Sequence, residues 1–144
     1  FPHLTPSNTG ADNPIKILSN LDLSNLDWIE VCYITRTYLT RHGAGHLENE
    51  CSKDEVNSIM YDKTNVPNEY QDTLRYGYLD INKLIKRVNN DFKKYESLNC
   101  NDKVFKTYLM THMNEFDIDP FEILEKDSDI EEIHMSFDEN LQVL

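Results

Sequence analysis

The chain has few glycines, few cysteines and few basic residues for its length, and each shortage excludes a class of protein. Only 4 of its 144 residues are glycine, and no glycine-rich, lysine-containing loop of the kind that cradles phosphates occurs in it. The 3 cysteines are an odd number without a CxxC pair, which argues against a disulfide framework and for a reduced, cytoplasmic setting. With 14 Lys+Arg against 26 Asp+Glu, the net charge of −12 argues against binding nucleic acid.

Long apolar runs are also missing, so the sequence predicts neither a membrane span nor a signal peptide. What is present is a globular composition, with 39% hydrophobic residues and 8 tyrosines in a chain long enough for one domain with a real core. We expect residues 1–144 to form a single α/β domain in which helices pack on a mainly parallel sheet.

Two segments have the apolar spacing of amphipathic helices. The first, Asp22–Tyr38, includes Trp28, which we expect to lie in the core. The second is Ile81–Glu96, which Asp80 can cap. The expected elements after it are a buried strand over 104–113, a short helix over 120–126 and a strand over 132–137, and we expect loops over 1–14 and a solvated acidic connection over 127–132.

The most informative stretch runs from Tyr38 to Asp80. It opens with Tyr38-Leu39-Thr40-Arg41-His42-Gly43-Ala44-Gly45, a chain that leaves a strand or helix end and turns through two glycines. Glycine at such a turn lets backbone N–H groups approach a ligand, and an arginine beside it suits a carboxylate or phosphate. The alternative is a tight surface turn with a solvated arginine.

Two histidines, His42 and His46, lie four positions apart with acidic residues and Cys51 close behind, a set that can be drawn as a metal site. Side chains at this spacing share a face only on a helix, and the glycines between them oppose a helix. We therefore predict solvated turn residues here and no metal.

Four segments resemble, in chain order, motifs of one enzyme family. Residues 1–9 are similar to Y-P-Y-V-T-S-S-N-T-T, residues 38–50 to Y-x-T-R-V-G-A-G-P-F-P-T-E, residues 68–80 to G-N-E-F-G-x-T-T-G-R-R-R-R-T-G-W-L-D, and residues 111–114 to T-K-L-D. These are motifs of adenylosuccinate synthetases, and the resemblance covers about residues 1–137. It identifies the chain as a central-to-C-terminal portion of a divergent member, part of that family's P-loop-NTPase-like α/β fold.

The resemblance implies a binding site for a purine nucleotide. The family threonine at the place of Thr5 contacts the 5′-phosphate, although Pro6 here replaces a serine. The residues expected to bind the substrate nucleotide are Thr5, Arg41, Gly43, Ala44, Gly45 and Arg75. The family's arginine-rich loop also grips L-aspartate, but this chain is about four residues shorter there and keeps one arginine, Arg75. A dicarboxylate calls for at least two cationic or multi-donor contacts, so the amino-acid co-substrate is left open.

A second implied site binds the base of a nucleoside triphosphate. In the family's T-K-L-D, the lysine stacks along guanine and the aspartate accepts hydrogen bonds from it. Here His112 and Asn114 take these places. A carboxylate only accepts, whereas an asparagine amide donates and accepts, which is the pattern of adenine. If a purine triphosphate binds here, we therefore expect the guanine preference to be lost and adenine to be accepted, which leaves the donor, GTP or ATP, open. The alternative is that Thr111–Asn114 is simply the end of a strand.

The enzyme implied by the resemblance uses a nucleoside triphosphate and Mg²⁺ to join an amino acid to a 6-oxopurine nucleotide. Its G-D-E-G-K-G loop and catalytic aspartate and histidine have no counterpart in this chain. We therefore predict no catalytic residue here, and Mg²⁺ only in the complete enzyme. The start at Phe1 suggests a piece of a longer protein, and the family's homodimer is one candidate oligomeric state. The alternative is a non-catalytic nucleotide-binding or assembly module.

Overall fold

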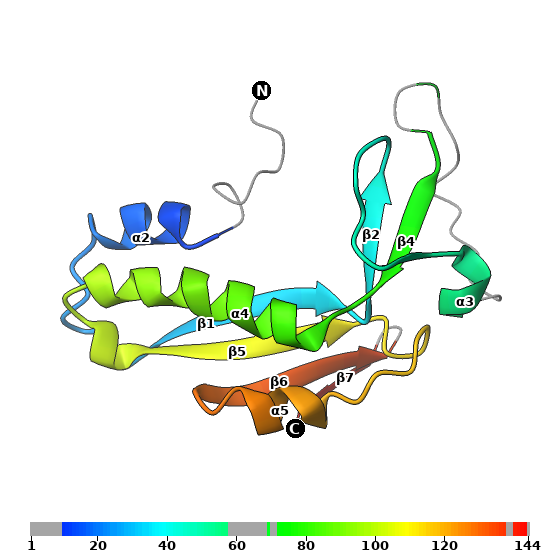
Figure 1. Ribbon diagram of the computed structural model, residues 1–144. Helices are drawn as coiled ribbons and strands as arrows, with labels where there is room; N and C mark the ends of the chain where they lie inside the picture. The colour runs from blue at the N-terminus through cyan, green and yellow to red at the C-terminus, as the bar shows by residue number, and fades with distance from the viewer. Residues whose placement is uncertain (1–9, 58–68, 70–71, 138–139, 144) are drawn as a thin grey trace.

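The computed structural model describes residues 10–57, 69, 72–137 and 140–143, and the structural statements that follow concern these residues. Its main sheet has the strand order β1-β5-β6-β7 (Figure 1). Strands β1 (Ile29–Arg36), β5 (Val104–Thr111) and β6 (Ile130–Phe137) are parallel, and β7 (Asn140–Val143) pairs antiparallel with β6. The prediction of an α/β protein with a mainly parallel sheet is confirmed.

Three helices lie on one face of this sheet. Helices α4 (Ile81–Phe92) and α5 (Phe121–Lys126) bury their apolar sides against β5 and β6, around the fully buried Tyr108 and Met110. Helix α2 (Asp12–Leu18) packs at the other end of the same face, where its side chains meet those of Ile29 and Val31. The 3-10 turns η1 (Lys93–Ser97) and η2 (Asn101–Lys103) connect α4 to β5.

The prediction of a helix from position 81 is confirmed, with its expected cap. The Asp80 carboxylate accepts a hydrogen bond of 3.0 Å from the backbone N–H of Lys83, which satisfies one of the unpaired donors of the first turn. Ile81, Ile85 and Val88 are buried, as their spacing predicts. The α-helical part ends at Phe92, and η1 completes the segment. The predicted strands near 104–113 and 132–137 and the short helix near 120–126 are also present, as β5, β6 and α5.

The helix predicted over Asp22–Tyr38 is wrong, because most of its second half is strand β1. Every second side chain of β1 from Ile29 to Thr35 points toward the helices, and the strand pairs in parallel with β5. The expectation of a core Trp28 is also wrong: its side chain is 58% exposed and rests on Phe105, with 5.3 Å between the ring centroids.

The loop predicted over 1–14 is wrong at its end. Helix α2 begins at Asp12 and contains Pro14 in its first turn, where a missing N–H removes no helical hydrogen bond. The earlier part of that loop, with Thr5, lies outside the described residues.

The acidic connection expected to be solvated contains a buried carboxylate. Asp127, at the end of α5, is 3% exposed and pairs with Lys106, which is 0% exposed. Asn89 of α4 accepts a further hydrogen bond from the Lys106 ammonium, and Tyr108 donates one to Asp127. The pair thereby joins β5, α4 and α5 beneath the helical layer.

A second, smaller sheet projects from the end of β1 (Figure 1). It consists of β2 (Tyr38–His42), β4 (Leu74–Tyr78) and β3 (Glu50–Cys51) in the antiparallel order β2-β4-β3. Helix α3 (Lys53–Asn57) packs beside it and contributes Val56 to a small core with Tyr38 and Tyr76. We call this unit, residues 38–57 and 72–78, the arm.

Candidate functional site

The two glycines of the arm form the turn that the sequence predicts. β2 ends at His42, and Gly43 and Gly45 follow with φ angles of 70° and 105°. A Cβ on Gly45 would lie 2.6 Å from Nη2 of Arg41, but this exposed side chain can move aside, so it is the positive φ of Gly45 that favours glycine here. The Arg41 side chain is exposed and its Nε donates a hydrogen bond of 3.1 Å to the carbonyl of Ala44. The guanidinium thus lies against the turn.

Arg75 lies opposite Arg41 in the β2–β4 register and holds the turn from the other strand. Its Nη1 donates to the carbonyls of Gly43 (2.9 Å) and Gly45 (2.7 Å). Its Nε and Nη2 form a bidentate pair with the Glu50 carboxylate at 2.7 and 2.5 Å. This pair holds the pKa of Glu50 below its ordinary value and raises that of Arg75. A ligand carboxylate at Arg75 would therefore compete with Glu50.

The predicted base-binding residues lie at the carboxyl end of β5. His112 follows the strand with a φ of 62°, a left-handed conformation that turns the chain sharply, and Glu115 N–H closes the turn on its carbonyl. The hydroxyl of Thr37, at the end of β1, donates to the same carbonyl at 3.0 Å. Asn114 is exposed in this turn. Open parallel sheets bind ligands outside the carboxyl ends of their strands, which is where this turn lies.

Tyr38 connects the carboxyl end of β5 to the arm. Its ring lies 5.9 Å from those of both His112 and Tyr76, and its hydroxyl donates to one oxygen of Glu115. The other oxygen of Glu115 is 3.1 Å from Nδ1 of His112. Burial, reinforced by the hydrogen bond to Glu115, raises the pKa of Tyr38 above its ordinary range, so the phenol is a hydrogen-bond donor here. Glu115 thus orients the His112 ring.

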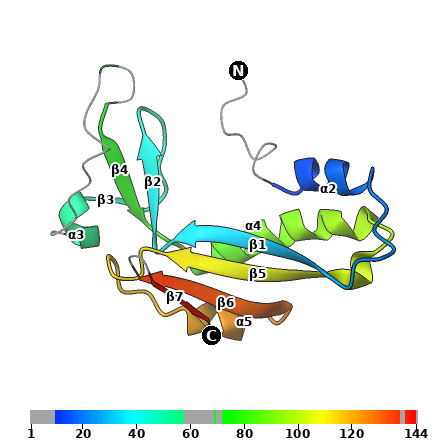
Figure 2. The same ribbon diagram turned by 180° about the vertical axis from the view of Figure 1, so that it is seen from behind.

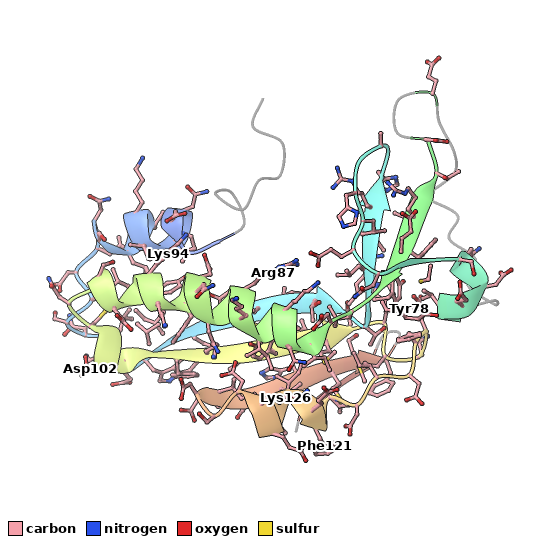
Figure 3. All side chains as sticks on the ribbon, viewed as in Figure 1. Tyr78, Arg87, Lys94, Asp102, Phe121 and Lys126 are labelled. Atoms are coloured by element: carbon pink, nitrogen blue, oxygen red, sulfur yellow. The ribbon has the colours of Figure 1, made fainter. Side chains whose placement is uncertain are left out.

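Two basic residues of α4, Lys83 and Arg87, contact the arm. Arg87 and Lys83 lie 3.1 and 3.4 Å from the same oxygen of Glu48, in the segment between the glycine turn and β3. Both are exposed, yet they tie the arm to the helix. In Figure 3, Arg87 of α4 and Lys94 of η1 lie on the side of the arm and of α2. Lys83 and Arg87 are four positions apart, which places both side chains on one face of the helix, and this spacing is the signal that could have indicated the contact.

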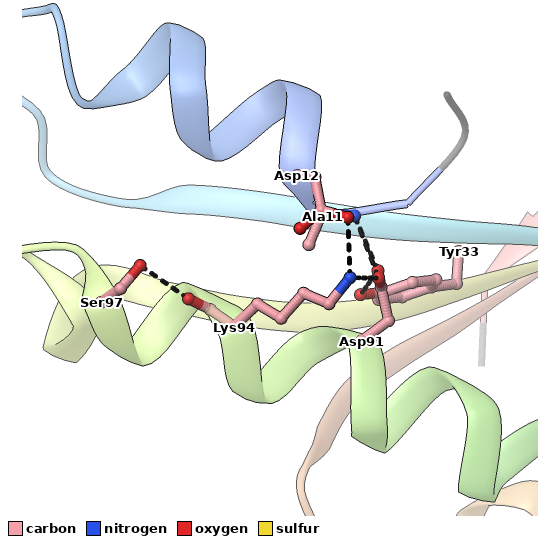
Figure 4. Close-up of polar contacts among 6 residues, drawn as sticks. All are labelled: Ala11, Asp12, Tyr33, Asp91, Lys94 and Ser97. Carbon is pink, nitrogen blue, oxygen red and sulfur yellow. Dashed lines mark hydrogen bonds and ion pairs between the residues drawn. The ribbon is translucent and has the colours of Figure 1, made fainter. Parts of the chain in front are cut away.

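The start of the described chain is fixed to the same side of α4 (Figure 4). The Asp91 carboxylate accepts hydrogen bonds from Ala11 N–H at 3.1 and 2.9 Å and from the Tyr33 hydroxyl at 2.9 Å. Lys94 pairs with Asp91 at 3.4 Å and with Asp12 at 2.9 Å. A hollow of about 540 Å³ adjoins this cluster. It is lined by Gly10, Tyr33, Arg87, Val88, Asn90, Asp91 and Lys94.

The expected site residues therefore fall into two groups. Five of them meet in the glycine turn of the arm: Arg41, Gly43, Ala44, Gly45 and Arg75. His112 and Asn114 lie at the carboxyl end of β5, linked to the arm through Tyr38. Thr5 belongs to residues outside the described ranges.

In the described part of the chain, no group of three or more histidine, cysteine or acidic side chains is placed to hold a metal ion. Within the same residues, no helix has the length and apolar character needed to cross a membrane. Comparisons with protein-family models, with curated proteins and with solved structures gave no match to this chain.

Proposed function

We propose that the chain is a nucleotide-binding portion of an adenylosuccinate-synthetase-like ligase. The complete enzyme would use a nucleoside triphosphate to join an amino acid to a 6-oxopurine nucleotide. The observation that carries this proposal is the turn at His112–Asn114, which follows a central parallel strand at its carboxyl end. The resemblance to the family's base-binding motif and the geometry of a parallel α/β sheet thus point to the same place.

The triphosphate base is proposed to bind against His112 and Asn114. The pairing of Nδ1 with Glu115 orients the imidazole, which offers a flat ring for stacking. The exposed amide of Asn114 can donate to one ring position of adenine and accept from its amino group. These features favour ATP as the phosphate donor.

The substrate nucleotide is proposed to bind between the arm and α4. The glycine turn holds the exposed Arg41, while the hollow beside Tyr33 is lined by Val88 and by Arg87 and Lys94. Guanidinium and ammonium groups suit a phosphate. Thr5, from the segment that precedes Gly10, is proposed to join them.

The acidic amino acid is proposed to reach Arg75 by displacing Glu50. Their bidentate pair demonstrates that the Arg75 guanidinium accommodates a carboxylate in this turn. With Glu50 already bound there, this chain discriminates against weakly binding carboxylates. Mg²⁺ is proposed to bind only in the complete enzyme, together with the phosphates of the nucleoside triphosphate.

Thermal unfolding with millimolar ATP or GTP and Mg²⁺ tests the proposal, because a bound ligand raises the unfolding temperature. We expect ATP to stabilise the chain more than GTP, and Asn114→Asp to reverse this preference. Asn99→Asp introduces the same charge in the turn before β5 and serves as the matched control. A GTP preference in the unchanged protein, or no stabilisation by either nucleotide, would contradict the proposed base site.

The second candidate is a non-catalytic nucleotide-binding or assembly module derived from the same family. The Arg75–Glu50 pair favours it, because Glu50 already occupies the one arginine that this chain keeps from the family's arginine-rich loop. The genomic sequence upstream of Phe1 separates the two candidates. A G-D-E-G-K-G loop in frame supports the ligase, and a start codon directly before Phe1 supports the module.

A further inference from the structure

One face of the main sheet exposes large apolar side chains. The side chains of β1, β5 and β6 alternate between the two faces, and helices α2, α4 and α5 all cover the same one. The opposite face comprises Glu30, Cys32, Ile34, Phe105, Thr107, Leu109, Glu132 and His134, together with Trp28. We call it the open face, and Figure 2 shows its strands in front of the helices. Ile34 is 69% exposed and Trp28 is 58% exposed.

A parallel sheet with one exposed face lacks the cover that such sheets normally have on both sides. Parallel strands occur almost only in sheets whose two faces are both covered, and the covering elements are helices. β1 and β5 lie side by side along their whole length with eight paired positions, so the exposed Ile34 belongs to a regular strand pair, and Trp28 stands directly before β1 against Phe105. Such a surface favours a partner that can bury both groups.

The charges of the open face indicate the character of that partner. Glu30 accepts a hydrogen bond of 2.7 Å from Thr107, and His134 lies 3.6 Å from Glu30 and 3.5 Å from Glu132. Arg36, at the end of β1, stands over the Tyr38 ring at the base of the arm. Glu30 thus lies between Trp28 and Ile34 along β1 with its carboxylate over β5, and His134 stands between this carboxylate and that of Glu132 on β6. A second copy packed face to face would bring carboxylates together in a chain of net charge −12.

We propose that the open face binds an amphipathic helix of a partner protein, with lysine or arginine beside the helix's apolar stripe. The stripe would cover Trp28 and Ile34, and the basic residues would meet Glu30 and Glu132. The eight residues of β1 span about 26 Å, which an α-helix covers with about 17 residues. This inference is independent of the proposed nucleotide chemistry, since the open face and the glycine turn use different residues.

Trp28 provides the readout, because it is the single tryptophan of the chain and lies in the proposed interface. The probe is a synthetic helix of about 17 residues with an apolar leucine stripe flanked by lysines, and the control peptide has glutamate in place of lysine. We expect the lysine peptide to shift the fluorescence emission maximum of Trp28 to shorter wavelength, and the shift to saturate as the peptide concentration rises. The glutamate peptide should bind at least about tenfold more weakly. Added salt should reduce this difference in affinity between the two peptides.

Matched variants locate the binding. Ile34→Asp should weaken the binding of the lysine peptide at least about tenfold. Ile17→Asp, at a 63% exposed position on α2, should leave this binding unchanged. Glu132→Lys should reduce the preference for the lysine peptide, and circular dichroism checks that each variant is folded. Equal binding of both peptides, no emission change with either, or an equal effect of Ile17→Asp would overturn the proposal. Self-association that Ile34→Asp abolishes would also overturn it, because a second copy would then occupy the face.

Discussion

The ammonium of Lys106 lies 2.8 and 2.7 Å from the two carboxylate oxygens of Asp127, and both side chains are 1% exposed. The two residues stand 21 positions apart, on β5 and at the end of α5. Asn89 and Tyr108 complete the hydrogen bonding around them. A buried charge pair of this kind holds three elements in one arrangement, because neither charge is tolerated there alone.

Removing one member of this pair should destabilise the protein strongly. We expect Asp127→Asn or Lys106→Met to lower the free energy of unfolding by about 3–5 kcal/mol, because each leaves a group without its buried partner. The double variant Lys106→Met/Asp127→Leu should lose much less free energy of unfolding, because it leaves no charge without its partner. Urea unfolding at neutral pH measures both, and Lys126→Met, in the exposed pair with Glu122, is the control. A single variant as stable as the unchanged protein would show that the pair is dispensable.

Three tyrosines should make the fold sensitive to alkali. Tyr33, Tyr38 and Tyr108 each donate to a carboxylate, and burial followed by that hydrogen bond raises the pKa of each above the ordinary value of 10.0. A group whose pKa is raised by folding stabilises the fold fully below its unfolded pKa, and this contribution is lost as the pH rises through the folded pKa.

We therefore expect stability to fall above about pH 10, and the three phenols to ionise only as the chain unfolds. Near-ultraviolet absorbance of tyrosinate, followed beside circular dichroism, measures this. Replacing Tyr33 with phenylalanine should remove one late-titrating phenol. Ionisation of all tyrosines at ordinary pKa in a folded chain would contradict the expectation.

The Arg75–Glu50 pair should control carboxylate binding at the glycine turn. We expect Glu50→Gln to increase the affinity for L-aspartate, because the guanidinium is released, and Arg75→Gln to abolish it. Calorimetry with L-aspartate measures the change, and L-asparagine, whose side chain is uncharged, is the control for the side-chain carboxylate. If Glu50→Gln leaves the binding of aspartate unchanged, Arg75 is a structural residue of the turn only.

The contribution of the Arg75–Glu50 pair to stability should depend on pH in the acid range. Folding depresses the pKa of Glu50 below its ordinary 4.5, so its contribution is present above that pH and is lost as the pH falls through the folded pKa. The difference in unfolding temperature between the unchanged protein and Glu50→Gln should therefore shrink below about pH 4.5. A difference that stays constant across this range would exclude the pair as its source.

Gly77 of β4 should not tolerate a side chain. A Cβ there would lie 2.6 Å from the backbone carbonyl oxygen of Glu48, which cannot rotate away. We expect Gly77→Ala to lower the free energy of unfolding by about 1–3 kcal/mol, through displacement of the segment that contains Glu48. Gly43→Asn is the control, because asparagine adopts its φ of 70° at low cost. Thermal unfolding compares them, and equal stability of the two variants would contradict the steric explanation.

Local signals in the sequence were sufficient for the elements that depend on neighbours in the chain. Helix α4 was predictable because Asp80 caps it and its apolar residues repeat at helical spacing. β5 was predictable because β-branched and aromatic residues make up most of Val104–Thr111. β1 was not, because its apolar residues fit both periods: Ile29 and Tyr33 are four apart, as on a helix face, and also belong to the alternating series of a strand. Only the pairing with β5 decides between them.

The candidate site divides in the same way. Arg41 and the two glycines were identifiable from sequence, because a glycine turn is a local backbone preference. The sequence by itself thus determined the class of fold, helix α4 and the glycine turn. Tertiary structure alone decided that Glu50 pairs with Arg75, that Asp127 is buried against Lys106, and that Trp28 lies on an exposed sheet face. Each of these depends on residues at least 21 positions apart, and no local pattern encodes which distant charge or strand will lie beside a given residue.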